Sequence, residues 1–305
     1  MKPLGTLNLS YLGQHHEGAT PPSNCFGEPS RCTGMLESLL VMLGVFLIAF
    51  IFAPVGMGGG MLFVPLLHYV AEWPIDGTLL AVSLTLTWAV SIGSGLRHRR
   101  EGFHNDAAIK SALYGALIGA LIGVGIVNAL GDKLDSVFKL LAIVMLVWAL
   151  AKTWKKVRTT EATASVEENG STEIHHFKLR VGGGIGGVLS SVLGVGAGVI
   201  YVPVLQQQAS LGPRTSVGSS LAIMMVVVPV AILALMTTSA NGLIDQFTAL
   251  PGHVYLLPVL AIVGATAGAK FGIERISKEN IMKLFMALVA VVLVRYAVDV
   301  ASIMV

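Results

Sequence analysis

The chain has 305 residues, of which 54% are hydrophobic and 12% are charged, with a formal net charge of +3. Soluble domains carry about 25% charged residues, so this composition and the recurrent long apolar runs exclude a soluble domain and indicate an all-helical membrane protein. The small net charge gives no reason to expect a nucleic-acid partner.

Residues 1–34 are polar and contain no apolar core of the kind found in a secretory signal peptide. We expect them to form a polar amino-terminal tail. Both cysteines of the chain, Cys25 and Cys32, fall in this tail. A disulfide and a reduced pair are both compatible with their spacing, so the sequence leaves their state open.

The next part, residues 35–154, is predicted to be the first membrane unit. It begins with an apolar stretch that a glycine run divides into a helix over residues 36–53 and a short segment over residues 61–71. The short segment has few residues for a complete span, so a re-entrant and a full-span geometry both stay open. Three further helices are expected in this unit, over residues 78–96, 107–130 and 137–154.

A polar, charged segment over residues 155–177 is predicted to be a flexible cytoplasmic linker. The second membrane unit, residues 178–305, follows the same plan as the first. Its expected helices cover residues 179–195, 199–211, 216–236, 254–271 and 281–301, with a glycine break between the first two.

The strongest signal in the sequence is a motif that occurs twice. GMGGGMLFVPLL covers residues 56–67, and GVGAGVIYVPVL covers residues 194–205, 138 positions later. Three glycines and a proline keep the same offsets in both copies, which indicates two copies of one membrane unit. The prolines of the motif, Pro65 and Pro203, are expected to have a structural role.

The basic residues of the loops predict that the two units have opposite orientations. Residues 97–110, 152–180 and 270–283 are rich in Lys and Arg and are expected in the cytoplasm, whereas residues 239–253 contain neither and are expected outside. The fold class expected is two inverted-topology repeats, each with a glycine-broken helix pair and three spanning helices, which gives about 8 to 10 transmembrane segments. Both termini are then expected on the extracytoplasmic side of the cell membrane.

The two glycine breaks are the expected substrate site. Glycine lets the backbone leave the helical conformation, and in a membrane such backbone is tolerated only inside the protein or beside a wet cavity. A helix that restarts after a break begins with unpaired N–H groups and a partial positive charge, which attract an anion. The binding residues expected from the breaks are Gly56, Met57, Gly58, Gly59, Gly60, Gly194, Gly196, Ala197 and Gly198. The alternative is that these glycines only permit close helix packing.

Hydroxyl groups on the helices that follow the breaks can bind an oxyanion without adding charge. Ser83 aligns with Ser219, and together with Ser220 these serines complete the predicted substrate site. Weaker candidates on the same helices are Thr85, Thr87 and Ser216. For each hydroxyl the alternative is a hydrogen bond to a carbonyl of its own helix.

Other patterns favour a structural role. Small residues at four-residue spacing, as at Gly115, Gly119 and Gly123, let one helix face approach a neighbouring backbone. Arg295 and Asp299 are expected to pair with each other or to reach the membrane surface.

No intramembrane carboxylate stands out as a proton carrier, and no metal or cofactor is expected. The sequence has no motif of an ATPase, a metalloprotease or a serine hydrolase.

At the paired glycine motifs the sequence resembles the TauE/SafE family of sulfite and organosulfonate exporters. The similar features are GMGGGMLFVP and GVGAGVIYVP, the hydroxyl-containing segments AVSLT and VGSSL, and the loops HRREGFHND and NGLID. The resemblance covers about residues 36–300. It implies secondary-active export of a small sulfur-containing or carboxylated anion such as sulfite or sulfoacetate, and it is compatible with a homodimer. One departure is Ala197, where the first copy of the motif has Gly59.

We therefore expect an alternating-access carrier, not an enzyme, that binds a small anion where the two repeats meet. A channel with the same fold, or a carrier of a different small anion, is the nearest alternative. A membrane-embedded enzyme is a more distant alternative, because no nucleophile and base occur at motif spacing. The expected partners are the anion, the lipid bilayer and a coupling ion, either a proton or another ion.

Overall fold

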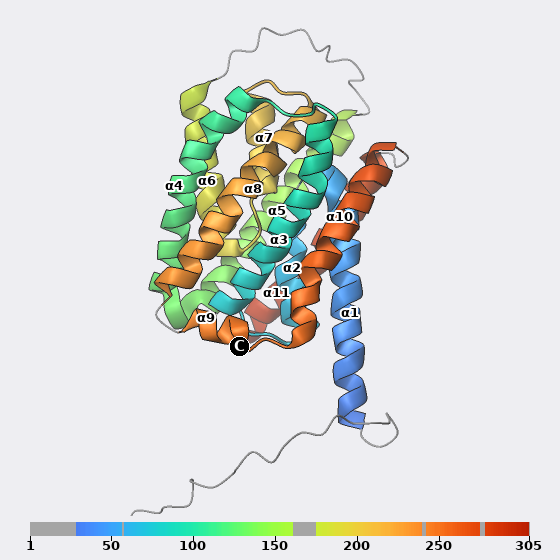
Figure 1. Ribbon diagram of the computed structural model, residues 1–305, viewed down its shortest axis with the longest axis vertical. Helices are drawn as coiled ribbons and strands as arrows, with labels where there is room; N and C mark the ends of the chain where they lie inside the picture. Colours follow the sequence, from blue (N-terminus) through green and yellow to red (C-terminus); the bar gives the residue numbers. More distant parts are fainter. Residues whose placement is uncertain (1–28, 57, 161–174, 240–241, 275–277, 305) are drawn as a thin grey trace, which may run out of the picture. The chain divides into compact units, whose positions relative to one another are not determined.

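The computed structural model describes residues 29–56, 58–160, 175–239, 242–274 and 278–304. All regular elements in these residues are helical (Figure 1). The chain divides into two units, residues 1–36 and residues 37–305, and the packing below is that of the second unit alone. The question of whether Cys25 and Cys32 pair lies outside the described residues.

The helices follow one another along the chain with short connections. Their bounds are α1 (Pro29–Phe52), η1 (Ala53–Val55), α2 (Gly60–Tyr69), α3 (Gly77–Arg100), α4 (Asp106–Leu130), η2 (Gly131–Lys133), α5 (Leu134–Thr160), α6 (His176–Leu193), α7 (Gly198–Gln208), α8 (Pro213–Thr238), α9 (Leu243–Thr248), η3 (Gly252–Leu256), α10 (Leu257–Glu274) and α11 (Lys278–Met304).

Each predicted helix is present, but several helices are longer than predicted. α1 begins at Pro29, inside the segment expected to be a polar tail, and α5 continues to Thr160, inside the expected linker. The reason is that hydropathy marks the apolar part of a helix, whereas its polar end turns remain helical. The loop over residues 239–253 also contains α9, a helix that was not predicted. α9 begins directly after Gly242, which has a left-handed φ of 61°.

Five helices in the described part of the chain are long and apolar enough to cross a membrane. They cover Gly77–Arg100, Asp106–Leu130, Leu134–Ala151, Pro213–Thr238 and Gly252–Phe271. α2 and α7 have only 10 and 11 residues. At ~1.5 Å per residue each is about 15 to 17 Å long, roughly half of a ~30 Å hydrocarbon core. These two helices are therefore too short to span the bilayer.

The glycine stripe on α4 forms a close backbone contact with α6. A methyl group on Gly115 would overlap the carbonyl oxygen of Arg180, and one on Gly119 would overlap that of Gly184. The same close approach occurs where α10 packs on the part of α1 within the second unit, because a methyl on Gly268 would overlap the carbonyl of Phe50. The prediction that these stripes serve helix packing is confirmed.

Gly119→Ala is expected to destabilise the protein by about 1–3 kcal/mol, because the added methyl group forces α4 and α6 apart. Gly125→Ala on the same helix is the matched control, since a Cβ at Gly125 meets nothing within 4 Å. Thermal unfolding of both variants in detergent measures the difference. Equal unfolding midpoints would show that the close backbone contact does not exist.

Candidate functional site

The first glycine break joins α1 to the short helix α2. After η1 the chain passes through three left-handed glycines, Gly56 (φ 73°), Gly58 (φ 70°) and Gly59 (φ 70°), and α2 begins at Gly60. Residues with a Cβ rarely adopt these angles, which explains the glycine run. Met57 lies outside the described residues.

The second break has the same conformation at the same offsets. Gly194 (φ 61°), Gly196 (φ 70°) and Ala197 (φ 49°) are left-handed, and α7 begins at Gly198. Ala197 therefore occupies the position of Gly59 and keeps the left-handed backbone in spite of its Cβ. Such strain costs about 1 kcal/mol and persists only where the surroundings fix it.

Exchanging these two residues tests the strain. We expect Gly59→Ala to lower the free energy of unfolding by about 1–2 kcal/mol, because it adds left-handed strain. Its Cβ would also lie 3.1 Å from both Ile48 Cγ2 and Phe63 Cζ. We expect Ala197→Gly to be neutral or to stabilise the protein by up to about 1 kcal/mol. Unfolding midpoints check the pair, and a destabilised Ala197→Gly variant would contradict the account.

The two breaks meet in the interior of the part of the chain formed by residues 37–305. A Cβ on Gly60 would lie 2.5 Å from the carbonyl oxygen of Val195 and 2.6 Å from Thr87 Oγ1. A Cβ on Gly58 would lie 3.0 Å from Thr87 Cγ2 and 3.4 Å from Met224 Sδ. A Cβ on Gly196 would meet the same two side chains, because it would lie 3.1 Å from Met224 Sδ and would overlap Thr87 Cγ2. Both breaks thus converge on Thr87 of α3 and Met224 of α8.

Thr87 presents an unused hydroxyl at this meeting point. The residue is fully buried, and among the described residues its Oγ1 has no hydrogen-bond partner. A buried polar atom without a partner is uncommon and needs an explanation. Thr87 lies four residues after Ser83, on the same face of α3. That spacing was a usable sequence signal for Thr87, whereas no sequence pattern identified Met224.

The starts of α2 and α7 also present backbone donors. Within the described chain, no side chain caps either helix. Among the described residues, the first N–H groups to find a carbonyl are those of Leu62, at 3.0 Å from Gly59 O, and of Ile200, at 2.9 Å from Ala197 O. The N–H groups ahead of them belong to the first turn, which has no intrahelical acceptor. Two partially positive helix ends therefore lie beside the Thr87 hydroxyl.

The three predicted serines lie next to the breaks and are all fully buried. Ser83 Oγ donates to the carbonyl of Gly194 at 2.7 Å, and Ser220 Oγ donates to the carbonyl of Gly56 at 3.4 Å. Ser219 Oγ accepts the N–H of Asn105 at 3.0 Å. Ser83 and Ser220 thus each hold the break that belongs to the other half of the chain, whereas Ser219 holds the start of α4.

The weaker hydroxyl candidates behave differently from these serines. Thr85 Oγ1 donates to the carbonyl of Ala81 at 2.7 Å, and Ser216 Oγ donates to that of Gly212 at 2.9 Å. Both bonds reach back four residues along the local chain. These two hydroxyls therefore bond to their own helix or its N-cap, as the alternative to anion binding predicts.

Pro65 and Pro203 lie inside α2 and α7, five residues after each helix begins. Proline has no N–H, so each removes the hydrogen bond that its helix would make to the carbonyl four residues earlier. The first turn of each short helix consequently makes one backbone hydrogen bond fewer to the rest of that helix. The structural role expected of the prolines is consistent with this position.

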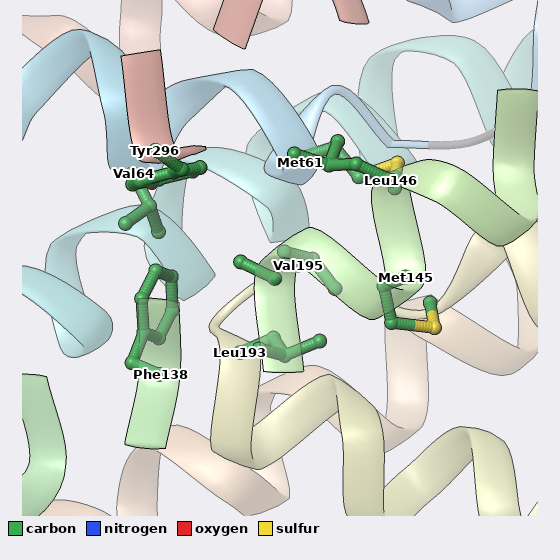
Figure 2. Close-up of a pocket in the computed structure, with 9 residues that line it drawn as sticks. Met61, Val64, Phe138, Met145, Leu146, Leu193, Val195 and Tyr296 are labelled. Atoms are coloured by element: carbon green, nitrogen blue, oxygen red, sulfur yellow. The ribbon is translucent and has the colours of Figure 1, made fainter. Parts of the chain in front are cut away.

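A cavity of about 20 Å³ adjoins the breaks. Met61 of α2 and Val195 of the second break line one part of it, and Val64, Phe138 and Tyr296 line another (Figure 2). Its size suits about one water molecule.

A family model described as "Sulfite exporter TauE/SafE" matches residues 41–296. This range includes both glycine breaks and Thr87. No curated protein and no solved structure matches the chain.

Proposed function

The chain belongs to the TauE/SafE sulfite exporter family, and on that premise we propose that it carries a small sulfur-containing anion by secondary-active transport. Members of this family are multi-pass membrane transporters and not enzymes. Within that class, sulfite and sulfoacetate are the substrates proposed here. Export, driven by the outward gradient of the anion itself, is the proposed direction.

The proposed anion site is the meeting point of the breaks, comprising Gly56, Met57, Gly58, Gly59 and Gly60 with Gly194, Gly196, Ala197 and Gly198. The observation that carries the proposal is the unpartnered Thr87 hydroxyl beside two uncapped helix starts. Backbone N–H groups and a hydroxyl bind an oxyanion without a fixed positive charge, which allows the anion to leave again. Ser83, Ser219 and Ser220 hold the surrounding backbone in place.

Alternating access in this proposal follows from inverted repeats. The matching φ angles at the two breaks and the exchanged serine contacts support two equivalent units. Rocking of one repeat against the other would open the site first to one side of the membrane and then to the other. The extracytoplasmic location of both termini and a homodimeric assembly belong to the same proposal.

Uptake by proteoliposomes tests the function. Labelled sulfite, sulfoacetate, sulfate and acetate are supplied to the vesicles with and without an imposed pH gradient, and protein-free vesicles are the control. We expect saturable uptake of sulfite or sulfoacetate and acceleration by unlabelled anion on the opposite side. Flux that neither saturates nor exchanges would indicate a channel. Folded protein that moves none of the anions would refute the substrate proposal.

A further inference from the structure

A charged cluster built around one buried lysine lies at the far end of α2, away from the glycine breaks. Lys139 of α5 is only 6% exposed. Its Nζ lies 3.1 Å from Asp135 Oδ2, on the same helix, and 3.6 Å from Asp299 Oδ2 on α11. A charge buried in a membrane protein is costly unless it is paired and commonly marks an ion pathway. Here one buried ammonium is shared by two carboxylates.

The cluster is connected directly to α2 by Tyr69, its last residue. The Tyr69 hydroxyl donates to Asp299 Oδ2 at 2.8 Å. The Arg295 guanidinium lies over the Tyr69 ring, 5.0 Å from its centroid. Any displacement of α2 therefore changes the hydrogen bonding of a carboxylate on α11.

Tyr296 connects the cluster to the cavity beside the breaks. Its ring lies 5.6 Å from that of Tyr69 and 6.2 Å from that of Phe138. Tyr296 is 1% exposed, and its hydroxyl has no partner among the described residues. Tyr296 and Phe138 line the cavity that also borders Met61 and Val195 (Figure 2). A buried hydroxyl is thus available where the cluster and the cavity adjoin.

The charges of the cluster permit it to bind one proton. The cluster holds the carboxylates of Asp135 and Asp299 together with the ammonium of Lys139 and the guanidinium of Arg295. Protonation of one carboxylate still leaves Lys139 paired with the other. Asp135 Oδ1 is a buried atom with no hydrogen-bond partner among the described residues. The titratable and charged side chains that meet here are His68 and Tyr69 of α2, Asp135 and Lys139 of α5, and Arg295, Tyr296 and Asp299 of α11.

We propose that Asp135 and Asp299, held by Lys139 and Tyr69, form a proton-binding site whose proton moves together with the anion. This inference rests on the proposed anion transport. Protonation adds one positive charge at one end of α2, and the anion adds a negative charge at the other end. α2 has 10 residues and is therefore about 15 Å long. At that distance and an effective dielectric constant of about 20, each ligand strengthens binding of the other roughly sixfold.

Asp299→Asn is the first test. Labelled sulfoacetate is supplied outside the proteoliposomes. Vesicles loaded with unlabelled sulfoacetate measure anion exchange without a gradient, and empty vesicles measure accumulation driven by an acidic exterior. Exchange needs no net proton movement, so we expect Asp299→Asn to retain it within about threefold while accumulation falls at least about tenfold. Asp245→Asn is the matched control, because Asp245 is an exposed carboxylate on α9. Both assays should be unchanged in this control.

Tyr69→Phe is the second test, because it keeps the ring that contacts Arg295 and Tyr296 and removes only the hydroxyl. The Asp299 carboxylate then loses one hydrogen-bond donor, so driven accumulation should fall at least about threefold while exchange without a gradient is retained. Unchanged accumulation in Tyr69→Phe, or full accumulation by Asp299→Asn, would overturn the proton site. Wild-type exchange without any response to a pH gradient would overturn it as well. Absence of wild-type exchange would instead refute the proposed transport, and the proton site with it.

Discussion

Gly196→Ala is expected to abolish anion transport. The new methyl group would overlap Thr87 Cγ2 and lie 3.1 Å from Met224 Sδ, so it occupies the space where the two breaks meet. Gly196 also has a left-handed φ of 70°, at which an alanine is strained by about 1–2 kcal/mol. We expect the transport rate to fall at least about a hundredfold, because a displacement of about 1 Å can cost that factor. Uptake of labelled sulfoacetate by proteoliposomes measures the loss.

A second substitution separates loss of the site from loss of the fold. Thr87→Ser removes the methyl group that Gly196→Ala overlaps and keeps the hydroxyl. The double variant should therefore recover a measurable part of the transport lost in Gly196→Ala. Gly58→Ala should be milder than Gly196→Ala, because its Cβ would lie 3.0 Å from Thr87 Cγ2. Equal loss of folded protein in Gly196→Ala and in the double variant would favour the packing alternative for these glycines.

Thr87→Val is expected to weaken anion binding by about tenfold to a hundredfold with little effect on the fold. Valine has nearly the shape of threonine, and a hydrogen bond to a charged group contributes about 1.5–3 kcal/mol. The stability of the free protein should be unchanged or slightly higher, because the substitution removes a buried hydroxyl that has no partner in the described chain. Equilibrium binding of labelled sulfoacetate and thermal unfolding measure the two effects.

Thr87→Ser is the matched control for that measurement, because it retains the hydroxyl and leaves only a small gap. Its dissociation constant should remain within about threefold of the wild-type value, since only a buried methyl group is lost. A Thr87→Val protein that binds the anion as tightly as wild type would remove Thr87 from the site. The backbone N–H groups would then be the remaining candidates.

The sequence was informative wherever function depends on local backbone conformation. Left-handed φ angles strongly favour glycine, so the positions of both breaks could be predicted from the glycines that the two copies of the motif share, such as Gly58 and Gly196. The helices were predictable for a similar reason, because apolar spans are long and continuous. The ends of the helices were less predictable. α5 continues to Thr160, and the polar turns at the end of a helix carry no hydropathy signal.

Contacts between distant segments could not be predicted. Ser83 was predicted to belong to the substrate site, but its acceptor, Gly194, lies 111 positions away in the other half of the chain. Lys139 and Asp299 lie 160 positions apart, so no spacing rule connects them. Met224 is an ordinary apolar residue in sequence, and only the packing of α8 brings its sulfur to the breaks. Such details depend on tertiary packing, which a single sequence does not encode in a local pattern.

The most direct test of the central claim is to locate a bound anion. Selenite is a heavier analogue of sulfite, and its selenium can be found by anomalous diffraction from crystals of the complex. The account predicts one peak within about 4 Å of Thr87 Oγ1 and of the first N–H groups of α2 and α7, the distance of an oxyanion's central atom from its hydrogen-bond donors. A peak only among the basic side chains of residues 97–100, or only beside Lys139, would contradict an anion site between the two breaks.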